Sequence, residues 1–166
     1  MVSVADHTLL VLRHGHADHP AGVGDFDRPL SNRGRKQIRA VAEHLESSGH
    51  RPELILSSSS RRTQETAQAF LEQVGLDIDI VQTRALYLAY VDEIANAVAS
   101  VPESVRSLMI VGHNPGFADL VERLAGQHVK FKTGALAVFK FGPDMQWNEI
   151  STAKPQFLGA FSLTKH

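Results

Sequence analysis

The chain has 166 residues, with 17 Lys and Arg against 18 Asp and Glu, nine His and no Cys. This length favours a single domain over residues 1–166, with a core large enough to fold without disulfides. The absence of Cys excludes disulfides, cysteine nucleophiles and thiolate metal sites. The formal net charge of −1 shows no basic excess, so the composition does not support a nucleic-acid or anionic-membrane partner.

The start of the chain shows no targeting pattern. Met1–Thr8 contains no Lys or Arg, and the apolar run Leu9–Leu12 that follows is too short for a signal peptide or a membrane span. We therefore expect a soluble, cytoplasmic protein, and we take it to be a monomer.

Short apolar runs alternate with amphipathic segments along the chain, which is typical of an α/β domain. In chain order the pattern predicts a strand over 8–12, a loop over 15–30, a helix capped by Ser31 and ending near Ser48, a strand over 54–56, a helix over 61–73 and a strand over 78–81. It then predicts a helix over 92–100, a strand over 108–111, a turn over 112–116, a helix ending near Ala125, and strands over 135–141 and 145–150. No element is predicted after Lys154. We expect a three-layer α/β/α sandwich with a mostly parallel central sheet.

Unusual polar residues follow three of the apolar strands directly. The three segments are Arg13-His14-Gly15, Ser57–Arg62 and Gly112-His113-Asn114. Ligands of open parallel sheets bind at the carboxyl ends of the strands, so we expect these segments to converge there. Arg forks bind phosphoryl oxygens, helix N-termini favour anions, and an imidazole can attack phosphorus. A lone His or Arg at a strand end is more often structural, but the conjunction at three strand ends favours a phosphoryl site.

Leu12-Arg-His-Gly15 resembles the signature of the histidine phosphatase superfamily, also called the phosphoglycerate mutase-like family. Three further stretches resemble family segments in the family's order: Arg28–Gly34, Ser58–Ala67 and Val111–Pro115. The short length, Arg28-Pro-Leu30, Ala85-Leu-Tyr87 and the His-Asn-Pro turn are most similar to small bacterial phosphohistidine phosphatases of the SixA type. The resemblance implies a phosphoglycerate mutase-like fold and a phosphatase that requires neither a metal nor another cofactor.

The resemblance also implies the roles of four residues. His14 would be the nucleophile, and Arg13, Arg62 and His113 would hold the phosphoryl oxygens. The family Arg lies four positions after a Ser and four before a Thr, which fits Ser58, Arg62 and Thr66. If Arg61 were the family Arg, the residue four positions later would be Glu65 and not Thr. We therefore expect Arg61 to be a solvated charge.

Many family members protonate the leaving group with an acidic residue, and this chain has no clear equivalent. Asn114 follows His113, where some members carry the acid. The remaining candidates are Asp18, Asp25, Asp27, Asp92 and Glu93. An alkoxide leaving group needs such help more than the nitrogen of phosphohistidine does. The sequence therefore favours phosphohistidine on a protein as substrate and inorganic phosphate as product, with small sugar phosphates as the alternative.

Two other interpretations compete with the phosphatase interpretation. His14, His16, Asp18 and His19 form a His-x-His-x-Asp-His string that resembles the metal-binding motif of metallo-β-lactamases. That interpretation is disfavoured, because the chain is short for the two-sheet fold and Arg62 would be unexplained. A catalytically silent phosphate-binding module is disfavoured by the nucleophilic imidazole. The histidines outside any motif are expected at the surface: His7, His44, His50, His128 and His166.

Overall fold

The computed structural model describes residues 6–163, which form a six-stranded sheet with the strand order β3-β2-β4-β1-β5-β6. The strands are β1 (His7–Arg13), β2 (Leu54–Ser58), β3 (Ile80–Thr83), β4 (Ser107–Gly112), β5 (Leu136–Phe141) and β6 (Gln156–Phe161). Strands β1 to β4 run parallel, whereas β5 and β6 are antiparallel additions at one side. The predicted mostly parallel sheet is therefore confirmed.

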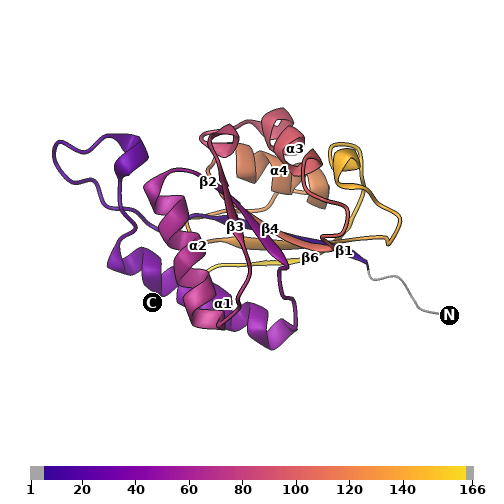
Figure 1. The fold of residues 1–166 in the computed structure, drawn as a ribbon, viewed down its shortest axis with the longest axis horizontal. Coiled ribbons are helices and arrows are strands. Elements are labelled where there is room, and N and C mark those ends of the chain that lie inside the picture. Colours follow the sequence, from indigo (N-terminus) through magenta and orange to yellow (C-terminus); the bar gives the residue numbers. More distant parts are fainter. Residues whose placement is uncertain (1–5, 164–166) are drawn as a thin grey trace.

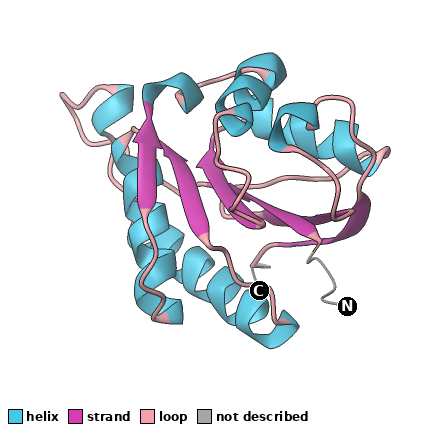
Figure 2. Ribbon diagram, turned by 45° about the vertical axis from the view of Figure 1, so that its right-hand side comes forward, coloured by secondary structure: helices cyan, strands magenta, loops and turns pink. Residues whose placement is uncertain are grey.

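Helices cover both faces of this sheet, as Figures 1 and 2 show. The helices are α1 (Asn32–Ser48), α2 (Arg61–Val74), α3 (Val91–Ala99) and α4 (Gly116–Ala125), with short 3-10 turns η1 (Asp25–Asp27), η2 (Arg84–Leu86) and η3 (Trp147–Glu149). Side chains of a strand alternate between the two faces, so Leu10 and Leu12 pack with α1 and α2 while Leu9 and Val11 pack with α3 and α4. This arrangement is the expected three-layer α/β/α sandwich.

The C-terminal part differs from the prediction. Residues 145–150 contain η3 rather than a strand, and the last strand, β6, lies beyond Lys154. The apolar signal near 147 comes from the buried Trp147, whose indole N–H donates to the Val105 carbonyl at 2.8 Å. β6 alternates exposed and half-buried residues and its pairing with β5 is irregular, so it carries a weak hydrophobic pattern.

Two smaller predictions also need correction. β3 spans Ile80–Thr83 rather than 78–81, because Ile78 packs against the core from outside the strand. His7 was expected at the surface, but it is 2% exposed and its ring lies edge-on to Trp147. The apolar side chains that flank His7 in space come from distant residues, which the local pattern does not reveal. His44 and His128 are exposed, and His166 lies outside the described residues.

Within residues 6–163 no helix is long and apolar enough to cross a membrane. The expectations of a single domain, a cytoplasmic location and a monomeric state stay predictions of the sequence.

The start of α1 packs tightly against the segment that follows β1. The Ser31 hydroxyl caps α1 by accepting from the Gly34 amide, and it also donates to the His16 carbonyl. A Cβ atom at Gly34 would lie 2.2 Å from the His16 carbonyl oxygen, well inside van der Waals contact. Only glycine permits this approach, so α1 and the β1 loop are positioned by each other.

We predict that Gly34→Ala destabilises the protein by about 1–3 kcal/mol, because the backbone must move apart to admit the methyl group. Urea denaturation measures the change. Gly24→Ala is the control, since Gly24 has an ordinary φ of −70° and its added Cβ would meet nothing within 4 Å. Equal stability of the Gly34 variant and the unmodified protein would contradict this packing argument.

Candidate active site

The backbone around His14 is fixed by the strands on either side of β1. The Arg13 amide donates to the Ala135 carbonyl at 3.0 Å, and the His14 amide donates to the Gly112 carbonyl at 3.1 Å. The Gly15 amide then donates to the Thr66 hydroxyl on α2 at 3.1 Å. The end of β1 is thus held by β4, β5 and α2 together.

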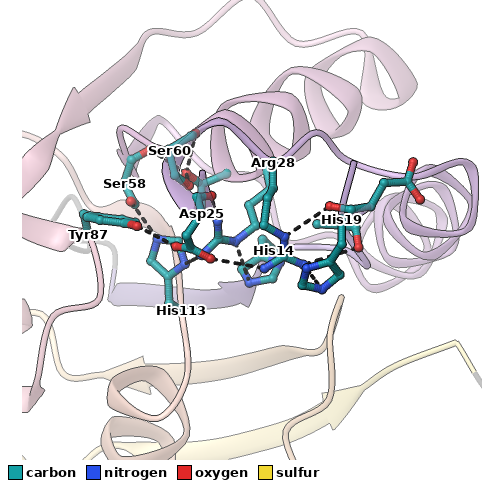
Figure 3. Close-up of polar contacts among 12 residues, drawn as sticks. His14, His19, Asp25, Arg28, Ser58, Ser60, Tyr87 and His113 are labelled. Atoms are coloured by element: carbon teal, nitrogen blue, oxygen red, sulfur yellow. Dashed lines mark hydrogen bonds and ion pairs between the residues drawn. The ribbon is translucent and has the colours of Figure 1, made fainter. Parts of the chain in front are cut away.

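His14 presents one nitrogen with a free electron pair. Its Nδ1 lies 2.7 Å from the Gly15 carbonyl oxygen, which can only accept, so Nδ1 carries the proton. In the neutral ring the lone pair is therefore on Nε2. The Nε of Arg62 lies 3.4 Å from that Nε2, and His14 is only 8% exposed. Figure 3 shows the His14 ring within the network of polar contacts that also includes Asp25 and His113.

Arg62 and His113 form the next part of the cluster. Arg62 stands in the first turn of α2, is 3% exposed, and its Nη2 lies 3.2 Å from His113 Nδ1. Because a guanidinium only donates, His113 Nδ1 is the acceptor and its Nε2–H donates to the Ser58 hydroxyl at 2.8 Å. The ring centroids of His14 and His113 lie 5.3 Å apart. The predicted Ser58–Arg62–Thr66 spacing thus places all three side chains at the site.

Arg13 completes the cluster, and one of its buried nitrogens has no partner. Its Nη1 donates to the Phe131 carbonyl at 3.1 Å, but its buried Nε has no hydrogen-bond partner. An unpaired buried donor is costly unless an acceptor arrives, so this N–H is well suited to an anionic ligand. All four predicted site residues line one cavity of about 330 Å³. The other lining residues are His16, Ala17, His19, Arg28, Leu88, Asn114 and Thr133.

Burial and positive charge keep both histidines neutral. Burial, with the charges of Arg62 and Arg13, lowers the pKa of His14 to about 4. Burial, with the neighbouring His14 and Arg62, lowers the pKa of His113 to about 3. Burial and the charge of Arg62 also lower the pKa of Arg13. The cluster therefore carries the positive charges of two guanidinium groups and no negative charge of its own. A phosphoryl dianion would compensate these charges.

One carboxylate reaches the cluster from the loop between β1 and α1. Ala17 and Leu30 form an isolated bridge, and the residues between them, loop 18–29, project from the body of the protein in Figure 1. The Asp25 carboxylate accepts from Arg62 Nη2 at 3.1 Å and from the Tyr87 hydroxyl at 2.5 Å. Partial burial would raise the pKa of Asp25, but the Tyr87 hydrogen bond and the charge of Arg62 outweigh it and lower that pKa to about 2.

The other candidate acids lie away from the four-residue cluster. Asp18 and Asp27 are exposed in loop 18–29, and Asp92 is exposed in the first turn of α3. Glu93 caps α3 by accepting from the Tyr90 amide at 3.0 Å. Asp25 is thus the one candidate that contacts the cluster, and it does so as an ionised carboxylate.

The side chains of the metal-binding hypothesis have other hydrogen-bond partners. His16 Nδ1 lies 2.7 Å from the Ser31 hydroxyl, and His19 Nε2 accepts from Arg28 Nη2 at 2.7 Å. In the described part of the chain no group of three or more His, Asp or Glu side chains is arranged to hold a metal ion. The fold also has one sheet rather than two, so the metallo-β-lactamase interpretation finds no support.

The sequence comparison agrees with this geometry. Residues 9–86 match the family described as the histidine phosphatase superfamily, branch 1. An uncharacterised chloroplastic protein of Arabidopsis thaliana is 33% identical over 153 residues, covering 85% of this chain and 69% of that protein. The chain belongs to the histidine phosphatase superfamily. The predicted resemblance is therefore confirmed, and with it a phosphatase activity.

Two more comparisons concern proteins with a named phosphatase activity. The crystal structure of a protein assigned as the phosphohistidine phosphatase SixA of Agrobacterium tumefaciens superimposes with a TM-score of 0.79 at 27% identity, covering 95% of this chain and 99% of that one. Glucosyl-3-phosphoglycerate phosphatase of Mycolicibacterium vanbaalenii is 40% identical over 75 residues, which is 43% of this chain and 32% of that enzyme. The SixA likeness thus extends over nearly the whole chain, and the second over less than half.

Sequence reasoning missed one contributor to the candidate site. Tyr87 both donates to Asp25 and lies edge-on to the His113 ring, with the ring centroids 5.4 Å apart. Its own position is supported by Phe26, whose ring is perpendicular to it at 5.0 Å. The Ala85-Leu-Tyr87 stretch was a signal of subgroup only. Nothing in it indicated a contact with a loop 62 residues away in the sequence.

We predict that stability falls as the pH is lowered from 7 to 4. Unfolded histidines take up protons near pH 6.5, whereas folded His14 does so only near pH 4, so acid favours the unfolded chain. His14 alone should contribute about 3 kcal/mol to this loss.

Urea denaturation at several pH values tests this prediction with the variant His14→Gln, which should lose correspondingly less stability than the unmodified protein. His44→Gln, exposed and outside the cavity, should keep the full pH dependence. Equal pH dependence in all three proteins would contradict the burial argument.

Proposed function

We propose that the protein hydrolyses phosphohistidine in proteins, through a phosphoryl group carried on His14 Nε2. The observation that carries this proposal is the neutral His14 ring, whose Nε2 lone pair lies beside Arg62 in a cavity lined by a second arginine and a second histidine. Such an arrangement supplies both a nucleophile and donors for the phosphoryl oxygens.

The reaction would take two displacements at phosphorus. In the first, the Nε2 lone pair of His14 forms a bond to phosphorus while the P–N bond to the substrate imidazole breaks. The electron pair of that bond leaves with the substrate nitrogen, which is protonated by solvent. In the second, a water oxygen attacks phosphorus and the P–N bond to His14 breaks, which returns the electron pair to Nε2. The water loses its proton, inorganic phosphate leaves, and the enzyme is restored.

Three donors stabilise the charge that develops on the phosphoryl oxygens. Arg13 contributes its unpaired buried Nε, and Arg62 contributes a guanidinium that is nearly inaccessible to water. His113 can donate from Nδ1 once it takes up a proton, which a bound dianion would favour. Fixed donors in a water-poor site need little reorganisation during the reaction. These groups supply the positive charge that a metal ion provides in other phosphatases.

The state of Asp25 supports a nitrogen leaving group. A carboxyl with a pKa of about 2 is ionised near neutral pH and has no proton to donate. An alkoxide leaves poorly without a proton, whereas an imidazole nitrogen with a pKa near 6.5 is readily protonated from solvent. The site therefore fits a phosphoramidate better than a phosphate ester. The glucosyl-3-phosphoglycerate phosphatase likeness keeps small sugar phosphates as the second candidate.

The test uses a synthetic peptide with one ³²P-labelled phosphohistidine, in buffer with EDTA. We expect the unmodified protein to release phosphate and, after rapid denaturation in alkali, to carry a base-stable and acid-labile label. His14→Ala should show neither, because no other group in the cavity presents a free imidazole lone pair at that place. His44→Ala, on the exposed side of α1, should behave as the unmodified protein does.

Three outcomes would overturn the proposal. Turnover by His14→Ala would remove His14 from the nucleophile role. Faster hydrolysis of glucosyl-3-phosphoglycerate than of the phosphohistidine peptide would assign the enzyme to the second candidate. Loss of activity in EDTA with recovery on adding zinc would favour the metal-binding hypothesis over a metal-independent phosphatase.

Adjacent arginines provide a matched pair for the phosphoryl contacts. We predict that Arg62→Ala lowers kcat/KM by about 100- to 1,000-fold, because it removes a buried donor to the phosphoryl oxygens. Arg61→Ala should change it by less than about threefold, since Arg61 is exposed and only pairs with Glu65 at 3.4 Å. Thermal denaturation of each variant checks folding, and Arg62→Lys keeps the charge if the alanine variant unfolds. A larger loss at Arg61 would contradict the assignment.

A further inference from the structure

The positive charges of the chain are unevenly distributed. Residues 28–42 contain five Lys or Arg and no Asp or Glu, although the whole chain has a net charge of −1. The five residues are Arg28, Arg33, Arg35, Lys36 and Arg39. Four of them lie in the first half of α1, and the rest of the protein is correspondingly acidic.

Helix stability does not account for this concentration. The N-terminus of a helix carries a partial positive charge, so acidic residues stabilise it and basic residues destabilise it by about 0.3–1 kcal/mol each. The first turn of α1 contains no acidic residue. Arg33 and Arg35, in the first turn, therefore oppose the helix dipole, and the concentration of positive charge needs another explanation.

Internal ion pairs account for only part of the charge. Arg28 pairs with Asp25 at 3.2 Å, and Arg35 pairs with Glu65 at 3.3 Å. Arg33, Lys36 and Arg39 are exposed and make no ion pair with any residue in the described range 6–163. We call these three side chains the basic face of α1.

The basic face begins next to the candidate active site. Ser31, which caps α1, lies 2.7 Å from the ring of His16, and His16 lines the cavity. Burial lowers the pKa of His16, and the charge of Arg33 lowers it further, so Arg33 stands near the cavity without lining it. In Figure 1, α1 starts where loop 18–29 returns to the body of the protein.

We propose that the basic face docks an acidic surface that surrounds the phosphohistidine of the protein substrate. This inference rests on the proposed function and adds the kind of protein that is preferred. Arg33 and Arg39 are six residues apart, about 9 Å along the helix, so the face extends away from the cavity. A small metabolite held in the cavity does not reach along that face, whereas a protein surface does. Unpaired cations beside a site speed the encounter with an acidic partner.

The experiment uses two synthetic peptides of equal length, each with one phosphohistidine, flanked by glutamates in one and by glutamines in the other. At low ionic strength we expect kcat/KM to be about five- to tenfold higher for the glutamate peptide, the size expected for a few exposed charge pairs. In Arg33→Glu/Lys36→Glu this preference should disappear or reverse. Salt at 0.5 M should abolish it in the unmodified protein, because exposed charges are screened.

Three controls separate docking from loss of structure or of chemistry. Arg51→Glu/Lys154→Glu reverses two exposed charges elsewhere, changes the net charge equally, and should keep the preference. Arg33→Glu/Lys36→Glu should be at least as stable as the unmodified protein, because glutamates suit the start of a helix. Its turnover of free phosphohistidine should be unchanged, since neither residue lines the cavity.

Equal kcat/KM for the two peptides in the unmodified protein would overturn the inference, and so would a preference that survives in Arg33→Glu/Lys36→Glu. If neither peptide is hydrolysed, the proposed function fails first. Fluorescence anisotropy with labelled, unphosphorylated peptides then tests docking without turnover. Tighter binding of a DNA oligonucleotide than of the glutamate peptide, lost in the same variant, would assign the basic face to nucleic acid and also overturn the inference.

Discussion

The buried guanidinium of Arg62 joins parts of the chain that are far apart in sequence. It reaches His14 after β1, His113 after β4 and Asp25 in loop 18–29, all from the first turn of α2. A buried cation is stable only where its donors are matched by acceptors. Here the acceptors are two imidazole lone pairs, a backbone carbonyl and a carboxylate. Arg62 sets the tautomer of His113, and its contact with His14 Nε2 agrees with the tautomer that the Gly15 carbonyl sets at His14.

Close backbone packing holds the residues that make these contacts in place. The residue after His14 is a glycine, at which a Cβ atom would lie 2.8 Å from the Gly34 carbonyl oxygen. Gly34 in turn lies against the carbonyl of His16. The nucleophile loop and the start of α1 therefore form a single packed unit. The same unit places the basic face of α1 beside the cavity, which links the chemistry of the site to the proposed choice of protein substrate.

The sequence predicts best what depends on short segments. The buried strands and the polar residues after them could be located, because a run such as Leu9–Leu12 followed by Arg13 and His14 is a local pattern. The convergence of the strand ends then follows from the rules of parallel sheets. The contact of Asp25 with Tyr87 could not be predicted, because it joins a loop to a residue 62 positions away. β6 was not predicted, because an irregular edge strand buries too little apolar surface to show a clear alternation of apolar and polar residues.

The contact between Asp25 and Arg62 has a consequence for the release of product. A phosphate that binds Arg62 Nη2 competes with the Asp25 carboxylate, which already lies 3.1 Å from that nitrogen. Because Asp25 is tethered by loop 18–29, it competes at an effective concentration on the order of millimolar or higher, whatever the amount of free phosphate. Inorganic phosphate, which brings no further binding energy from an attached protein, is the ligand that this internal competitor displaces most readily. For the proposed reaction, an internal competitor of this kind would weaken inhibition by the product.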